Sequence, residues 1–298
     1  MDPVRANTVA VGIDLGTSNT VVAHVDGGVA RAIADTLSNE LIIPSVCAFH
    51  PSGAVLIGRE AKERRLQDSK NTVFSTKRLI GRPWGSREVA QARARLPYEL
   101  KQGKNSSVLV VSRGKEYTLP EISAFVLRKA KAIAELALKK PATRAVITCP
   151  ANVDDLQRGA TKLAGKLAGL EVLRVLNEPT AAALAYGYRR RPAGATGVVV
   201  DLGGGTFDVT VMEYDGAELK VRATGGDAYL GGANFDKVLF DASSSGSSPR
   251  TAWTSTTRTR CRSTSAPRSR RTGCCAPRGP STTSPPATGP ASRCKPQA

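Results

Sequence analysis

Two short turns that begin with aspartate are the segments of this chain best suited to chemistry. They read DLGT at 14–17 and DLGGGTFD at 201–208, and each follows an apolar run that is typical of a buried strand. Because glycine has no Cβ, backbone N–H groups in such turns approach phosphate oxygens closely. The aspartate that opens each turn would face Mg²⁺ and its waters. One Asp-Gly corner is usually a simple hairpin turn, but two of them predict two related lobes around one nucleotide.

Residues in both turns are candidates to bind the β- and γ-phosphates through backbone and hydroxyl donors. They are Gly16, Thr17, Ser18 and Asn19 in the first turn, and Gly203, Gly204, Gly205 and Thr206 in the second. Transfer of a phosphoryl group to water needs positioned phosphates, neutralised charge and an oriented water, with little covalent work by the protein. The residue types of both turns fit these needs.

Three further segments carry a family resemblance that covers roughly residues 8 to 240. NTVFSTKRLIGR at 71–82, the run at 147–187 that ends NEPTAAALAYG, and GGDAYLGGANFD at 225–236 resemble the nucleotide-binding domain of the 70-kDa heat-shock chaperones, the DnaK type. Sugar kinases and bacterial actins share the two turns but do not resemble KRLIGR or NEPTAAALAYG. The resemblance implies an α/β actin-like ATPase (ribonuclease-H-like) fold with two lobes. It also implies a stress-response chaperone that binds ATP or ADP with Mg²⁺ and hydrolyses ATP to drive protein folding.

The resemblance also implies a role for individual side chains. Asp14 and Asp201 match positions that hold Mg²⁺ through water, and Lys77 resembles the lysine that reaches the γ-phosphate and the attacking water. Glu178 resembles the glutamate that ties the water shell of the metal to the inter-lobe region, and Asp208 the carboxylate that orients the water. Asp201 and Asp208 compete for the role of base. The plain alternatives are a surface lysine at 77 and, at 178, a first-turn glutamate favoured by the helix dipole.

Pro150, Arg158 and Arg174 match family positions that relay the nucleotide state toward a substrate domain. A strand-ending proline and two surface arginines explain these residues equally well. Two pairs depart from the family pattern near this relay. Asn152-Val153 stand where an aromatic pair is usual, and Ala233-Asn234 stand where two acidic residues are common. The resemblance therefore predicts phosphate binding more directly than it predicts coupling to partners.

Hydrophobic periodicity places these motifs on an alternation of strands and helices. We expect strands at about 8–14, 19–25, 44–49, 143–149, 171–176, 197–202 and 206–213, and helices at about 58–68, 119–140, 153–168 and 179–187. Thr118 and Glu121 form a capping-box pattern at the start of the second helix. Residues 1–190 would form lobe I, with a polar, loop-rich insertion at 39–116, and residues 191–240 would form part of lobe II.

The composition changes after Phe240. Residues 241–298 are rich in Ser, Thr, Pro and Arg and contain no Leu, Ile, Val, Met, Phe or Tyr. Such a segment is predicted to be disordered, because it has too little apolar surface to offset its ordering entropy. We favour a shifted reading frame over an evolved tail that binds acidic polymers.

The family segments that form the adenosine pocket, the peptide-binding domain and its lid have no counterpart here. Impaired hydrolysis is expected, and the alternative is a non-catalytic fragment that binds co-chaperones or exchange factors.

The net charge and the cysteine positions further limit the classes of function that this chain could have. The net charge is +18, but residues 241–298 supply half of it, so it is poor evidence for specific nucleic-acid binding. Cys47 and Cys149 lie in apolar runs and are expected to be buried, and the four cysteines of the tail do not have metal-site spacing.

The N-terminus lacks a signal-peptide pattern and no apolar window has membrane length, which predicts a cytoplasmic location without membrane contact. The resemblance implies unfolded clients, a J-domain co-chaperone and an exchange factor as partners.

Overall fold

The computed structural model describes residues 8–186, 194–215 and 218–244. The strands are β1 (Val9–Leu15), β2 (Asn19–Asp26), β3 (Val29–Ala32), β4 (Ile43–Pro44), β5 (Val46–Phe49), β6 (Val55–Ile57), β7 (Thr72–Phe74), β8 (Glu99–Gln102), β9 (Val108–Ser112), β10 (Lys115–Thr118), β11 (Ala142–Cys149), β12 (Glu171–Asn177), β13 (Ala195–Leu202), β14 (Phe207–Asp215) and β15 (Glu218–Asp227). The α-helices are α2 (Arg59–Arg64), α3 (Arg87–Arg95), α4 (Leu119–Leu138), α5 (Asp155–Leu167), α6 (Glu178–Ala185) and α7 (Gly232–Ser244), and short 3-10 turns are η1 (Ser69–Asn71), η2 (Thr76–Arg78) and η3 (Lys104–Ser106).

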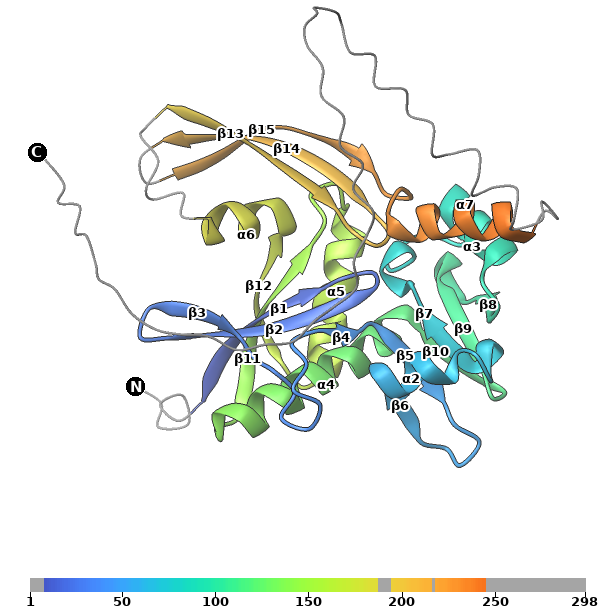
Figure 1. Cartoon of the computed structure of the whole chain (residues 1–298). Coiled ribbons are helices and arrows are strands. Elements are labelled where there is room, and N and C mark those ends of the chain that lie inside the picture. The colour runs from blue at the N-terminus through green and yellow to red at the C-terminus, as the bar shows by residue number, and fades with distance from the viewer. Residues whose placement is uncertain (1–7, 187–193, 216–217, 245–298) are drawn as a thin grey trace, which may run out of the picture. The chain divides into compact units, whose positions relative to one another are not determined.

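A six-stranded mixed sheet is the framework of the first lobe (Figure 1). Its order is β12-β11-β1-β2-β3, with β4 paired to β2. The strands β1, β11 and β12 run parallel, whereas β2 is antiparallel to β1 and turns back from it directly. Parallel strands bring their carboxyl ends to one edge of the sheet. The first aspartate turn, the end of β11 and the start of α6 therefore meet at this edge.

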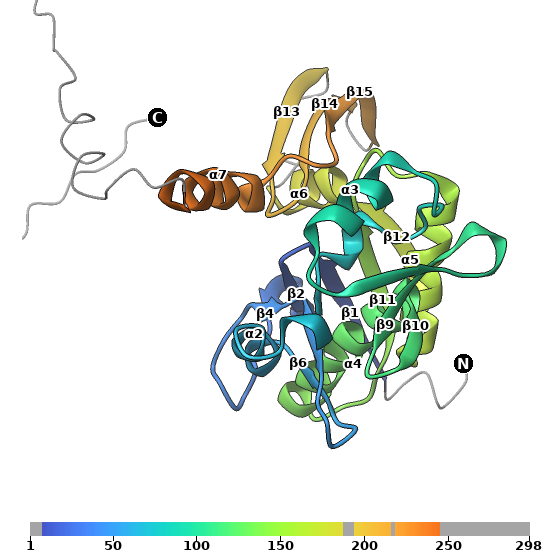
Figure 2. The ribbon, with the colours of Figure 1, turned by 90° about the vertical axis from the view of Figure 1, so that its right-hand side faces the viewer.

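Helices α4 and α5 pack against each other and against this sheet. Ile122, Leu127 and Ala130 of α4 are buried in the same core as Ile13 and Ile147 of the strands. The predicted capping box of α4 is present. The Thr118 hydroxyl accepts a hydrogen bond from the Glu121 backbone N–H, and the Glu121 carboxylate accepts one from the Thr118 backbone. Figure 2 shows this part of the fold after a quarter turn, with α5 right of centre and α4 below it.

The insertion at 39–116 is more regular than its polar composition predicts. It contains two three-stranded antiparallel sheets, β6-β5-β7 and β10-β9-β8, together with α2 and α3. The expectation of a loop-rich segment was wrong in this respect. These strands have only three to five residues, too few for a periodic signal, and backbone pairing with neighbouring segments forms them.

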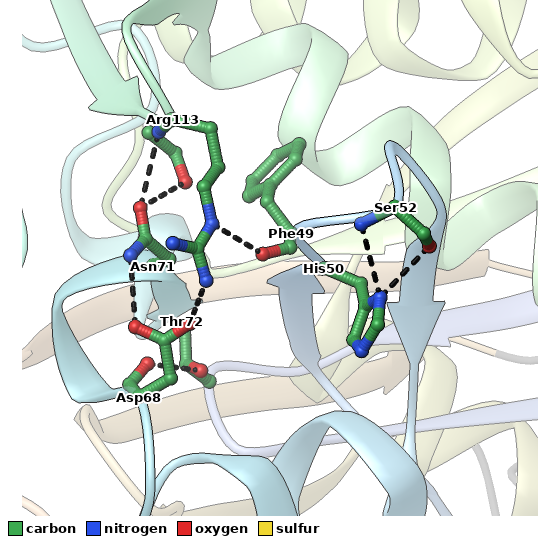
Figure 3. A network of polar contacts seen from close by, with 8 residues as sticks. Phe49, His50, Ser52, Asp68, Asn71, Thr72 and Arg113 are labelled. Atoms are coloured by element: carbon green, nitrogen blue, oxygen red, sulfur yellow. Dashed lines mark hydrogen bonds and ion pairs between the residues drawn. The ribbon is translucent and has the colours of Figure 1, made fainter.

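Polar contacts around Arg113 join these small sheets (Figure 3). Arg113 lies in the turn between β9 and β10, where its φ of 51° is left-handed. Its Nε donates to the carbonyl oxygen of Phe49 at 3.2 Å, and its guanidinium forms an ion pair with Asp68. Asn71 Oδ1 accepts from the Arg113 backbone N–H at 3.0 Å. One side chain thus connects the turn to the end of β5 and to the segment before β7.

A three-stranded antiparallel sheet, β13-β14-β15, carries the second aspartate turn. Helix α6 contacts both β12 and β13, so it lies between the first sheet and this one (Figure 1). Strand β15 and helix α7 were not predicted. Strand β15 alternates the charged residues Glu218, Lys220 and Arg222 with Leu219, Val221 and Ala223, an alternation typical of a strand, and it pairs with β14.

The predicted strands and helices are present within a few residues of their expected bounds. Helix α7 runs to Ser244, so the first four residues assigned to a disordered tail are helical, which corrects that boundary. The rest of the tail and the lobe boundary at 190–191 lie outside the described residues. Cys47 and Cys149 are both buried, as predicted, and burial raises the pKa of the Cys47 thiol to about 12.

Candidate functional site

The two aspartate turns and Lys77 surround one cavity of about 230 Å³. The cavity is lined by Asp14, Gly16, Thr17, Ser18, Asn19, Lys77, Glu178, Asp201, Gly203, Gly204 and Thr206. Every one of these residues was a candidate from the sequence. The segments that bring them together lie far apart in the chain, so the cavity depends on how the sheets pack.

The first turn joins β1 to β2. Asp14 pairs with Val21 in the antiparallel ladder, and Gly16 to Ser18 form the connection. Thr148 on the neighbouring strand β11 donates a hydrogen bond to Asp14 Oδ1 at 2.6 Å. This bond holds one carboxylate oxygen of Asp14 toward β11 and leaves the carboxylate on the cavity wall.

The second turn joins β13 to β14 and is closed by a hydrogen bond from the Gly203 N–H to the Thr206 carbonyl at 2.9 Å. The turns approach each other closely, because a Cβ added to Gly204 would lie 2.1 Å from Ser18 Oγ. The start of α7 packs on this turn. Gly232 and Ala233 donate backbone hydrogen bonds to the carbonyls of Gly203 and Gly204, each at 3.0 Å.

Gly231 makes this docking sterically feasible and was missed as a site residue. A Cβ at Gly231 would lie 2.5 Å from the Gly205 nitrogen and 2.7 Å from the Gly203 carbonyl oxygen. A side chain there would push the phosphate turn away from α7. The paired glycines at 231–232, just before a helix, were the sequence signal for this close backbone contact.

Lys77 and Glu178 form a mostly buried ion pair on the cavity wall. Lys77 comes from η2, and Glu178 is the first residue of α6, ahead of Pro179. Only 11% of the Lys77 side chain and 12% of the Glu178 side chain are exposed. Burial raises the pKa of Glu178, the Lys77 charge and hydrogen bond lower it, and the charges of Asp14 and Asp201 raise it. Lys77 is therefore not a solvated surface lysine.

Asp201 and Asp208 lie directly opposite each other on β13 and β14. Directly opposed side chains share a face of the sheet. Asp208 is buried, with 6% of its surface exposed. Burial raises the pKa of Asp208 and the charge of Asp201 raises it further, whereas Lys77 and a hydrogen bond from Asn152 lower it. Asp208 lies behind the cavity wall and Asp201 on it.

Asn152 is a second residue that the sequence did not identify as part of the site. Its Nδ2 donates to Asp208 Oδ1 at 3.2 Å, and its Oδ1 accepts from the Thr224 hydroxyl at 2.5 Å. Asn152 follows β11 in the first lobe, whereas Asp208 and Thr224 lie on the second sheet. The amide therefore joins the lobes at the position where the family usually has an aromatic residue.

The structure brings two of the three predicted relay residues together. Arg158 on α5 donates to Asn177 Oδ1 at 2.6 Å and contacts Cys149 Sγ, which precedes Pro150. Asn177 immediately precedes Glu178, so Arg158 is one residue removed from the cavity wall. Pro150 and Lys77 line the same small void of about 20 Å³. Arg174 is exposed on β12 and makes no hydrogen bond or ion pair within the described residues.

The side chains fit a hydrated magnesium nucleotide better than a directly bound metal. Among residues 8–186, 194–215 and 218–244, no three His, Cys, Asp or Glu side chains are grouped to hold a metal ion. Mg²⁺ keeps several waters and binds through one or two carboxylates plus phosphates. Asp14 and Asp201 both line the cavity and offer two carboxylates of the kind that this arrangement needs, and the glycine turns bring backbone N–H groups beside them.

The fold and the paired turns define the class of actin-like ATPase folds. The family model described as Hsp70 protein matches residues 10–247. The chain therefore belongs to the Hsp70 family of chaperones, which generally bind ATP or ADP with Mg²⁺, have ATPase activity and work with co-chaperones and clients. Within its described part, no helix combines the length and apolar character needed to cross a bilayer.

Proposed function

We propose that this chain binds MgATP or MgADP between the two aspartate turns and hydrolyses ATP as the nucleotide-binding part of a DnaK-type chaperone. One observation carries the proposal. Asp14, Lys77, Glu178, Asp201 and the glycine turns converge on a single cavity although the sequence separates them widely. Family membership makes this cavity the natural nucleotide site.

The proposed roles follow from the positions of the side chains. Backbone N–H groups of Gly16 and Gly204 and the hydroxyls of Thr17 and Thr206 would bind phosphate oxygens, whereas the Gly203 N–H closes the second turn. Asp14 and Asp201 would hold Mg²⁺ through its waters, and the metal would neutralise phosphate charge when bound. These roles use positioning and electrostatics only, which suits phosphoryl transfer.

Four charged groups would control the attacking water, two of them as alternatives for one role. Lys77 would leave its partner Glu178 in part to reach the γ-phosphate and the water, while Glu178 keeps the water shell oriented. Asp201, on the wall, and Asp208, behind it with a raised pKa, are both candidates to accept the proton. A carboxylate with a raised pKa is a better base near neutral pH than an ordinary one.

The wider role is also a proposal. Hydrolysis would act on unfolded clients through a substrate domain, in the cytoplasm, with a J-domain co-chaperone and a nucleotide exchange factor. Pro150, Arg158 and Arg174 would transmit the nucleotide state. The second candidate is a non-catalytic fragment that binds co-chaperones or exchange factors. Exposed apolar side chains on α7, among them Val238, Leu239 and Phe240, favour a binding surface there.

Calorimetry and phosphate release on the full chain separate these functions. We expect magnesium-dependent binding of ATP, weakened at least tenfold in Asp14→Asn because a metal-holding carboxylate is lost. Asp26→Asn is the matched control, since Asp26 is exposed at the far end of β2. Binding with phosphate release supports the ATPase, and binding without it supports the non-catalytic fragment. Absence of binding, or equal binding by Asp14→Asn, would contradict the proposed site.

A further inference from the structure

A second cavity, of about 250 Å³, lies next to the phosphate turns and is lined by positive charge. We call it the arginine cavity. Its ionisable lining residues are Arg65, Arg78, Arg95, Lys237 and Tyr229, and no carboxylate of the described residues lines it. It is formed by segments from both lobes, namely the end of α2, η2, the end of α3, and the start of α7.

Two of the guanidinium groups lie over aromatic rings. Arg65 stacks on Phe74 with 3.8 Å between the guanidinium carbon and the ring centroid, and Arg78 lies over Tyr229 at 4.9 Å. Stacking orients a guanidinium while its N–H edge stays available for hydrogen bonds. An edge of this kind matches two oxygens of a phosphate group.

The positive charge is not neutralised by neighbouring carboxylates. Arg65, Arg78 and Arg95 form no ion pair within the described part of the chain, whereas Lys237 pairs with Asp241 at 2.6 Å. Arg78 Nη2 donates to the neutral amide of Asn234 at 3.2 Å, and its buried Nε has no hydrogen-bond partner. An amide at position 234 satisfies one N–H group without cancelling the charge.

The electrostatic environment of Arg78 also favours an anion in the arginine cavity. Burial lowers the pKa of the Arg78 guanidinium, and the charge of Arg95 lowers it further, against opposing effects from Tyr229 and Asp227. Two cations that disfavour each other on one cavity wall are stabilised by an anion placed between them.

The arginine cavity is connected to the phosphate turns. A larger cavity of about 830 Å³ shares Arg65, Arg95 and Lys237 with the arginine cavity. At its other end the larger cavity shares Ser18 and Gly204 with the nucleotide cavity. The larger cavity therefore adjoins both the turns and the arginines, and Asp236 is also among its lining residues.

We propose that the arginine cavity is an oxyanion site that binds a phosphate group through Arg65, Arg78 and Arg95. The phosphate group comes either from free phosphate or pyrophosphate, or from a ligand whose other phosphates lie at the turns. Bidentate contacts from the stacked arginines provide the selectivity for a tetrahedral oxyanion over chloride. The site is separate from the nucleotide cavity and does not require ATP hydrolysis.

Calorimetric titration of the full chain with pyrophosphate, without Mg²⁺ and at fixed ionic strength, tests the site. We expect Arg65→Gln and Arg95→Gln each to weaken binding by about tenfold, since each removes a charge-assisted contact. Arg31→Gln is the matched control, because Arg31 is exposed on β3 and loses the same charge far from the cavity. Lys77→Ala removes a cation from the nucleotide cavity and therefore reports pyrophosphate that binds at the phosphate turns instead.

The outcomes separate this site from the nucleotide cavity. Pyrophosphate that still binds in the presence of saturating MgATP identifies a free-anion site. If MgATP displaces pyrophosphate, and if Arg65→Gln also weakens the binding of MgATP, the phosphates of the nucleotide reach the arginines. Equal weakening in Arg31→Gln means unspecific surface charge and overturns the proposal. If Lys77→Ala loses pyrophosphate binding while Arg65→Gln and Arg95→Gln keep full affinity, pyrophosphate binds at the turns. This result also overturns the proposal.

Discussion

Lys77 and Glu178 form an ion pair across 101 residues of sequence, and nearly nine-tenths of each side chain is buried. The pair joins η2 to the first residue of α6 at the wall of the nucleotide cavity. A buried charge that loses its partner is costly, because desolvation is no longer offset by attraction. The pair therefore contributes to stability as well as to the proposed chemistry, and the two contributions can be separated.

Lys77→Ala is expected to lower ATP turnover by about 100-fold or more, because the group that positions the water is lost. The far-UV circular dichroism should not change, but the thermal midpoint should fall because Glu178 remains buried and unpaired. The double variant Lys77→Ala/Glu178→Gln should recover the midpoint without recovering turnover. Turnover at the level of the unmodified chain would return Lys77 to a structural role only.

Asn152→Leu should raise the pKa of Asp208 further. The hydrogen bond from Asn152 lowers this pKa against the effects of burial and Asp201, so its removal leaves only Lys77 to oppose them. Titration of the Asp208 carboxyl carbon by NMR measures the shift. Gln102→Leu, at an exposed amide side chain in β8, serves as the control. An unchanged Asp208 titration would mean that the 3.2 Å contact is not formed in solution.

Asp208→Asn should stabilise the fold at neutral pH. Because the folded state raises the pKa of Asp208 above its ordinary value of 3.8, the ionised carboxylate costs stability above the folded pKa, and this cost disappears below 3.8. We expect the thermal midpoint of the variant to rise by about 2 °C at pH 7, as ~1 kcal/mol gives in a domain of this size. The gain should vanish at acid pH. A variant less stable at pH 7 would contradict the assigned direction.

Gly231→Ala should disrupt the second phosphate turn, since its Cβ would lie within 2.7 Å of the backbone of Gly203 and Gly205. Nucleotide affinity should fall at least tenfold, a change of ~1.4 kcal/mol. Gly225→Ala is the matched control in the same lobe, because nothing lies within 4 Å of its Cβ. Calorimetry with MgADP reads the difference, and equal affinities would show that α7 does not support the turn.

The outer face of β13 is expected to bind hydrophobic dyes and to promote self-association. Val198 is 60% exposed and Val200 is 63% exposed, so Lys at either position should reduce dye fluorescence while the thermal midpoint changes by less than about 2 °C. Val199 points to the opposite face, toward partly buried surroundings. Val199→Lys should destabilise the sheet instead, and a harmless Val199→Lys would contradict this assignment of faces.

Much of the first lobe was predictable because its signals are local. Strand β1 begins with the apolar run VAVGI and strand β11 contains the apolar run AVI, and the capping box at Thr118 marks the start of α4 without reference to the rest of the chain. Strand β15 was not predicted, although Leu219, Val221 and Ala223 alternate with charged residues as in a strand, and its antiparallel partner β14 became visible only in the tertiary structure. Asn152 was noticed as a departure, but its contact with Asp208 depends on how two separate sheets pack.

The sequence alone determined which residues could bind phosphate, since aspartate-glycine turns after apolar strands are a local property of the chain. It also determined the family, through motifs that extend over most of its length. Only the tertiary structure decided that Lys77 pairs with Glu178, that Gly231 supports the second turn, and that three arginines share a cavity. These relationships join segments tens to more than a hundred residues apart, and local sequence does not encode the distance between such segments.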